Sequence, residues 1–133
     1  MSKVHFIGIG GTGISAIALL LLEKGWQVSG TDKSASRYFD AVTTKGAYTL
    51  LGHSPELALA ADIIVRSSAV HDDDPEVVAA RKMGIPVLKR NEFLPELTAG
   101  YQTIAVAGSH GKTTCTAMLV TMLRGLGMDP TFI

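Results

Sequence analysis

Residues 3–13 of the chain read KVHFIGIGGTG, a short apolar run that ends in a glycine-rich loop. Residues 4–7 are almost continuously apolar, which is typical of a strand that is covered on both faces in a parallel sheet. Residues 12–24 follow as a helix, with Gly25 in place as its C-terminal cap. A buried strand, a glycine loop and a helix in this order predict the first unit of an α/β domain.

The alternation of strand and helix continues along the chain. We expect further strands at residues 27–30, 47–51, 62–65 and 86–88, and helices at residues 34–45, from 52–55 onward, 75–84 and 91–98. Asp74 before Pro75 predicts an N-cap followed by the first helical residue. The alternation implies right-handed crossovers, so we predict a Rossmann-like, doubly wound parallel sheet over residues 1–99.

Residues 100–133 hold one further strand and helix. Residues 98–101 have the composition of a linker, 103–107 form a buried-type strand, and a helix runs from Lys112 to about Leu126. One strand with one helix cannot cover both faces of the strand. We therefore expect the incomplete beginning of a second α/β domain. The alternative is that this strand adds to the edge of the first sheet. An exposed strand edge at 103–107 would also favour self-association.

Composition narrows the class of protein. Apolar residues make up 47% of the 133 residues, and twelve basic residues balance twelve acidic ones, so the formal net charge is zero. That balance argues against a nucleic-acid or membrane partner. Cys115 is the only cysteine, which excludes an internal disulfide, and no run reaches the roughly 18 apolar residues of a membrane span. We predict a soluble cytoplasmic protein.

The first loop has the spacing of a nucleotide-binding loop. Gly8, Gly10 and Gly13 fit G-x-G-x-x-G, in which the glycines permit a tight turn, close approach of a phosphate and close helix packing. Asp32 lies at the end of the second expected strand, where a carboxylate can grip a ribose hydroxyl. The pattern is typical of NAD binding, but the same geometry holds any nucleoside diphosphate. The ligand stays open at this point.

The second loop, GSHGKTT at residues 108–114, resembles an ATP loop. The strict pattern G-x-x-x-x-G-K-[ST] would need glycine where Val106 stands. Gly111, Lys112 and Thr113 fit the rest of it. Lys112 would neutralise phosphate oxygens and the Thr113 hydroxyl would bind Mg²⁺. The loop predicts binding of ATP with magnesium.

Three smaller features of the sequence bear on function. The run His71 to Asp74 could suggest a metal site, but Pro75 after it favours a polar loop with a helix cap. Ser67 and Ser68 end the fourth strand, so their hydroxyls can face the ligand of the first loop. Cys115 is interpreted as a buried structural thiol rather than a reactive one.

Several stretches together resemble the Mur ligases, and within that family the enzymes that add L-alanine to UDP-N-acetylmuramate. The similar stretches are residues 5–15, 28–32, 52–53, 67–70, 74–76, 85–87, 105–114 and 127–132. The loop of this family begins with a small residue rather than glycine, which accounts for Val106. The resemblance covers the whole chain.

The resemblance implies a UDP-substrate site in the first domain and an ATP site in the second. The expected UDP-site residues are Gly8, Gly10, Gly11, Thr12, Gly13, Ile14, Asp32, His53, Ser67, Ser68 and Ala69. The expected ATP-site residues are Gly108, Ser109, His110, Gly111, Lys112, Thr113 and Thr114, with Lys112 catalytic and Thr113 on the metal. The implied reaction forms an acyl phosphate from ATP and the muramyl carboxylate, which the amine of L-alanine then attacks.

Two alternatives remain beside this reading. One is the related ligase that recycles murein tripeptide, because that enzyme shares the fold and the ATP loop. The other is an NAD-binding module of a dehydrogenase or sensor, which would have no use for the second loop. The remaining ligase machinery is expected beyond residue 133, so we expect this chain to bind the UDP substrate and to catalyse nothing alone.

Overall fold

The computed structural model describes residues 2–133. These residues form two compact units, the first ending at Leu97 and the second formed by Thr98–Ile133. The assignment of residues 1–99 to a substrate domain and of 100–133 to an ATP domain stays a prediction.

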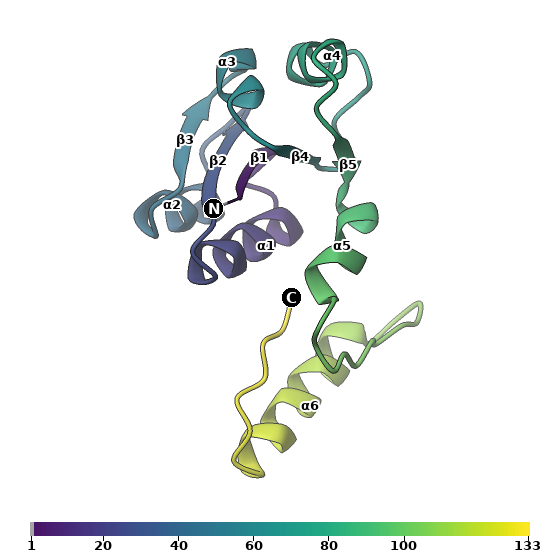
Figure 1. The fold of residues 1–133 in the computed structure, drawn as a ribbon. Helices are drawn as coiled ribbons and strands as arrows, with labels where there is room; N and C mark the ends of the chain where they lie inside the picture. The colour runs from purple at the N-terminus through teal and green to yellow at the C-terminus, as the bar shows by residue number, and fades with distance from the viewer. Residues whose placement is uncertain (1) are drawn as a thin grey trace. The chain divides into compact units, whose positions relative to one another are not determined.

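The first unit is built on one parallel sheet (Figure 1). Within residues 2–97 its strands lie in the order β3-β2-β1-β4-β5. Their bounds are β1 (Lys3–Ile7), β2 (Gln27–Asp32), β3 (Tyr48–Leu51), β4 (Ile63–Arg66) and β5 (Val87–Lys89). Phe6 in the central strand pairs with Gly30 on one side and Val65 on the other. The predicted doubly wound parallel sheet is confirmed.

Helices cover both faces of the sheet, with α1 and α2 on one side and α3 and α4 on the other in Figure 1. The helices of the first unit are α1 (Thr12–Glu23), α2 (Arg37–Thr44), α3 (Pro55–Leu59), α4 (Pro75–Lys82) and α5 (Arg90–Thr98). In the part of the chain that is described, no helix has the length and apolar character needed to cross a bilayer.

The core has two layers because successive side chains of a strand point to opposite faces. Val4 and Phe6 of β1 belong to the larger cluster, together with Ile17 and Leu21 of α1. Ile7 belongs to the smaller cluster on the other face. The smaller cluster is formed by Ile7, Ala58, Ile64, Val77 and Ala80. β1 is therefore covered by apolar side chains on both faces of the sheet, as its almost continuously apolar sequence predicts.

The predicted cap of α4 is confirmed, and α2 has a cap that was not predicted. Asp74 caps α4 by accepting from the Glu76 N–H at 2.9 Å, and Pro75 is its first residue, as predicted. Ser36 caps α2 by accepting from the Phe39 N–H at 3.1 Å. That cap makes α2 begin at Arg37, slightly later than the expected start at residue 34.

The second unit contains α6 (Lys112–Gly125), which matches the expected helix. The strand expected over residues 103–107 is wrong, because the structure has no regular hydrogen-bonded element there. A strand needs a neighbour for its backbone groups, and Thr98–Ile133 contribute none within the described residues. Ile104 is 64% exposed, so these residues are not buried either. The strand does not add to the edge of the five-stranded sheet among the described residues, and self-association of the chain stays a prediction.

Candidate functional site

Two glycine loops open α1 and α6, and neither helix has a side-chain cap. Gly11 is the N-cap of α1 and Gly111 that of α6, and no acidic residue lies in either first turn. Ser36, Ser54 and Asp74 cap α2, α3 and α4 instead. An uncapped helix start offers free N–H groups and about half a positive charge. The two predicted phosphate loops thus have helix ends suited to anions.

The first loop lies where the winding of the sheet reverses. β1 is flanked by β2 on one side and β4 on the other, which is the position where open α/β sheets bind ligands. Gly8 has φ of +84°, and a Cβ there would lie 3.0 Å from the Ser67 Cβ. The Ser67 N–H donates to the Ile7 carbonyl at 3.0 Å. Ser67 therefore packs against Gly8, and its contact with a ligand of the first loop stays a prediction.

Asp32 holds the loop in shape. Its Oδ2 accepts from the Gly10 N–H at 2.8 Å, and Ser36 Oγ donates to the Gly10 carbonyl at 3.0 Å. A Cβ on Gly10 would lie 2.9 Å from each of these oxygens. One carboxylate oxygen of Asp32 is therefore committed to the loop. The Ser34 N–H donates to the other oxygen across 3.3 Å.

Arg90 is a site residue that sequence reasoning missed. A Cβ built on Gly13 would lie 2.7 Å from Arg90 Cζ, so the guanidinium lies against the loop at the start of α1. Arg90 is exposed and opens α5 directly after β5. Its place just past the carboxyl end of a parallel strand is the signal that could have identified it. A guanidinium beside an uncapped helix start favours binding of a phosphate.

The other predicted UDP-site residues differ in exposure. Gly11, Thr12, Ser68 and Ala69 are exposed beside the loops that follow β1 and β4. Ile14 is 3% exposed and packs in the larger core cluster, so its side chain is a core residue. His53 is exposed and lies near Asp74 Oδ2 and Glu76 Oε2. None of these arrangements tests a ligand contact, and the UDP site stays a prediction.

A buried polar network lies on the α3–α4 side of the sheet. Glu76 and His5 are fully buried, and His5 Nε2 lies 3.0 Å from Glu76 Oε1. Thr31 Oγ1 donates to both Glu76 oxygens at 2.8 Å, and His5 Nδ1 lies 2.9 Å from Ser29 Oγ. The Ser54 N–H donates to Oε1 at 3.2 Å.

This network sets the protonation state of Glu76. Burial disfavours the ionised carboxyl, but the hydrogen bonds from His5, Thr31 and the Ser54 N–H outweigh it and hold the pKa of Glu76 below its usual value. The sequence reading missed both His5 and Glu76. A histidine inside an otherwise apolar strand run was the available signal.

Arg66, the last residue of β4, has a carbonyl and a carboxylate as partners for its guanidinium. It is 6% exposed, and it donates to the Val70 carbonyl at 2.8 Å and to Asp72 Oδ1 at 2.7 Å. Arg81 reaches the same Asp72 oxygen at 2.9 Å. The hydrogen bond from Arg81 and the charge of Arg66 lower the pKa of Asp72. The polar loop and helix cap favoured from the sequence are confirmed at Asp72 and Asp74.

The second loop is open to solvent. Gly111 has φ of +77°, which favours glycine, and the Lys112 ammonium donates to the Gly108 carbonyl at 2.7 Å. Lys112 is thus folded back over the loop, where phosphate oxygens could replace that carbonyl. Ser109, His110, Thr113 and Thr114 are exposed. These residues fit the ATP and Mg²⁺ prediction but do not test it.

Cys115 is exposed, so the expectation of a buried thiol is wrong. The reason is that α6 buries little of its surface. Val120 is its buried residue, while Met118 and Met122 are 60% and 63% exposed.

The chain is similar to known proteins over nearly its full length. A family profile described as "Mur ligase family, catalytic domain" matches residues 3–102. The UDP-N-acetylmuramate–L-alanine ligase of Frankia casuarinae is 50% identical over 98% of this chain and 27% of its own length.

Solved structures agree with this likeness. The crystal structure of UDP-N-acetylmuramate–alanine ligase from Thermotoga maritima has a TM-score of 0.91 at 32% identity, over 98% of this chain and 31% of that one. A murein peptide ligase from Psychrobacter arcticus has a TM-score of 0.89 at 29% identity, over 97% of this chain and 28% of that one. The chain spans less than a third of the length of these relatives.

Proposed function

We propose, because this chain belongs to the Mur ligase family, that it is part of an ATP-dependent ligase of peptidoglycan precursor synthesis. The proposed reaction joins L-alanine to UDP-N-acetylmuramate, the activity named for the Frankia casuarinae relative. The observation that carries the proposal is the pair of uncapped, glycine-led helix starts at α1 and α6. The proposed enzyme works in the cytoplasm, where ATP is available.

The first loop is proposed to hold the diphosphate of the UDP substrate. The N–H groups at the start of α1 and the Arg90 guanidinium would share its negative charge. Asp32 would position the loop through Gly10 and offer its second oxygen to the nucleotide. Ser67, Ser68, Ala69 and His53 complete the proposed site.

The second loop is proposed to hold ATP. The start of α6 would bind phosphate oxygens, and Lys112 would turn from the Gly108 carbonyl to the phosphates. Thr113 would hold Mg²⁺, which would neutralise charge on the phosphates when bound. Ser109, His110 and Thr114 would line the same loop.

The proposed chemistry has two steps. A carboxylate oxygen of the muramyl group attacks the γ-phosphorus of ATP, ADP leaves, and an acyl phosphate results. The amine nitrogen of L-alanine then attacks the acyl carbon, phosphate leaves, and the amide bond forms. Lys112 would stabilise charge on the transferred group. Residues 1–133 alone are proposed to bind the UDP substrate without completing this reaction.

One alternative has a specific observation in its favour. The murein peptide ligase from Psychrobacter arcticus is nearly as similar in structure as the alanine ligase, with TM-scores of 0.89 and 0.91. The proposed alanine ligase and the murein peptide ligase would use the same two loops, so the two functions differ in the amine that the enzyme accepts. Amide formation by the whole protein with L-alanine supports the first, and formation only with a tripeptide supports the second.

Calorimetric titration of this chain with UDP-N-acetylmuramate and with NADH tests the proposed ligand class. We expect binding of the UDP-sugar at least about tenfold tighter than NADH, since a charged hydrogen bond contributes about 1.5–3 kcal/mol. Arg90→Ala should weaken UDP-sugar binding about tenfold, and Lys89→Ala, at the neighbouring exposed cation, should not. Tighter binding of NADH would overturn the proposal in favour of a dehydrogenase module.

A further inference from the structure

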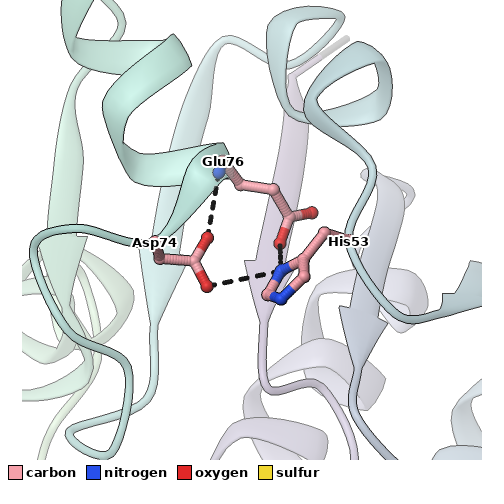
Figure 2. Close-up of side chains that lie close together, drawn as sticks. All are labelled: His53, Asp74 and Glu76. Carbon is pink, nitrogen blue, oxygen red and sulfur yellow. Dashed lines mark hydrogen bonds and ion pairs between the residues drawn. The ribbon is translucent and has the colours of Figure 1, made fainter.

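Three side chains that could ligate a metal converge beside the sheet, and only Asp74 among them belongs to the run of residues 71–74 that first suggested a metal site. His53 follows β3, Asp74 caps α4, and Glu76 lies in the first turn of α4 (Figure 2). One ligand atom from each lies within 4.8 Å of the others. His53 is 41% exposed, whereas the side chains of Asp74 and Glu76 are 10% and 0% exposed. Two well-buried carboxylates thus face one accessible imidazole.

The two distances from the His53 nitrogen are longer than those of good hydrogen bonds and suit ligands that share one metal ion. His53 Nδ1 lies 3.4 Å from Asp74 Oδ2 and 3.6 Å from Glu76 Oε2. An N–H···O hydrogen bond would bring these atoms to about 2.9 Å. In a tetrahedral site with bonds of about 2.1 Å, neighbouring ligand atoms lie about 3.4 Å apart.

The rest of the network holds the two carboxylates in place. Asp74 uses Oδ1 to accept from the Glu76 N–H at 2.9 Å, which leaves Oδ2 toward His53. Glu76 uses Oε1 to bind His5 Nε2 and the Ser54 N–H, which leaves Oε2 with Thr31 and toward His53. Such partners of metal-binding carboxylates orient the ligands before the ion arrives.

The donor set selects the kind of ion. Mg²⁺ and Ca²⁺ prefer oxygen ligands alone, whereas one imidazole with carboxylates suits Zn²⁺ and related transition ions. Two buried carboxylates also favour a divalent cation, because its charge would offset theirs where water cannot.

We propose that His53 Nδ1, Asp74 Oδ2 and Glu76 Oε2 form a binding site for a divalent transition-metal ion, best matched by Zn²⁺. The accessible side at His53 leaves a fourth position for water or another ligand. This site differs from the Mg²⁺ site proposed at Thr113 in donors, in location and in the ion it takes. It does not depend on the proposed ligase activity.

Titration of the chelator-treated chain with Zn²⁺ alone tests the site. We expect one bound ion, and a tetrahedral visible spectrum when Co²⁺ replaces Zn²⁺. His53→Gln and Asp74→Asn should each weaken Zn²⁺ binding by more than about tenfold. Asparagine caps a helix as well as aspartate does, so Asp74→Asn keeps the start of α4. Circular dichroism checks that both variants fold.

His71→Gln is the matched control, because His71 is an exposed histidine in the same connection before Asp74. It should bind Zn²⁺ as the unchanged chain does. The proposal is overturned if the unchanged chain binds no Zn²⁺, if His53→Gln and Asp74→Asn bind it equally well, or if His71→Gln loses as much as they do. Titration of UDP-N-acetylmuramate in chelator reports on the first loop separately.

Discussion

Glu76 shows how a single residue can be both buried and ionised. Its side chain is fully buried, yet His5, Thr31 and the Ser54 N–H all contact its oxygens. A buried charge is tolerated only when such partners replace its water. Among residues 2–133, no buried side-chain nitrogen or oxygen lacks a partner. Removing one partner should therefore cost more stability than a hydrogen bond usually contributes, because a buried polar atom is left without a partner.

The lowered pKa of Glu76 predicts a stability that falls in acid. Its folded pKa lies below the usual value of 4.5, so the unfolded chain binds the proton more tightly. The stabilisation is complete above about pH 4.5 and is lost as the pH falls through the folded pKa. Urea unfolding from about pH 6 to about pH 3, in chelator, should show this decline. His5, His53 and Asp74 are the other titratable groups that face Glu76.

Glu76→Gln should flatten that decline, because the amide does not titrate. Glu56→Gln changes an exposed carboxyl in α3 and should leave the slope nearly as it was. An unaltered slope in Glu76→Gln would show that other carboxyls cause the acid sensitivity.

Gly10 is a position where any side chain would break the loop. Its Cβ would meet Asp32 Oδ2 and Ser36 Oγ at 2.9 Å, and both atoms already bind the Gly10 backbone. We expect Gly10→Ala to lower the free energy of unfolding by about 1–3 kcal/mol and to weaken binding of UDP-N-acetylmuramate. Gly125→Ala is the control, since no atom lies within 4 Å of its Cβ. Equal losses in urea unfolding for both variants would contradict this reasoning.

At the scale of elements, the starts of five helices divide into two kinds. α2, α3 and α4 begin with polar caps, and α1 and α6 begin with glycine. A polar cap satisfies backbone N–H groups within the chain, whereas a glycine start leaves them to a ligand. The capping pattern therefore separates α2, α3 and α4 from the two helices that open a candidate phosphate loop.

Ser36→Ala should destabilise the first unit more than the loss of an N-cap alone would, because the Ser36 hydroxyl makes two hydrogen bonds. Ser36 Oγ accepts from the Phe39 N–H at 3.1 Å and donates to the Gly10 carbonyl at 3.0 Å. Loss of an N-cap costs about 1 kcal/mol of stability. Loss of the hydrogen bond to the Gly10 carbonyl adds to that cost. Ser54→Ala, whose oxygen accepts from Leu57 at the longer distance of 3.4 Å, should cost less in thermal unfolding. A larger loss in Ser54→Ala would contradict the ranking.

At the scale of the whole molecule, stability is unevenly distributed. The first unit holds both buried clusters, while α6 in the second unit buries Val120 alone among its described residues. Burial of apolar surface is the main source of folding free energy. The first unit should therefore account for the cooperative unfolding of the chain.

Amide hydrogen exchange should make this difference visible. We expect strong protection in β1 and β4, whose strands have neighbours on both sides, and weak protection in α6. A chain shortened to residues 1–99 should also keep its thermal midpoint within a few degrees. Protection in α6 equal to that in β1 would show that the second unit is stabilised by contacts beyond its own core.

A feature could be predicted when the residues that cause it are neighbours in the sequence, and not when folding brings them together. The α4 cap was predictable because Asp74 and Pro75 are neighbours in the chain. The strand at 103–107 was predicted wrongly because a strand needs partners that sequence cannot supply. Arg90 was missed because only the folded chain brings its guanidinium to Gly13. Glu76 was missed because its partners come from β1, β2 and the turn before α3.

The sequence by itself determined the order of strands and helices in residues 1–99, the glycine loops and the α4 cap, since each depends on residues close together along the chain. It also determined the family, through motifs spread over its length. Only the tertiary structure decided which distant side chains meet: Ser67 with Gly8, Arg90 with Gly13, and His53 with Asp74 and Glu76. The reason is that parallel crossovers bring strand ends together across long stretches of chain, and those separations leave no periodic signal in the sequence.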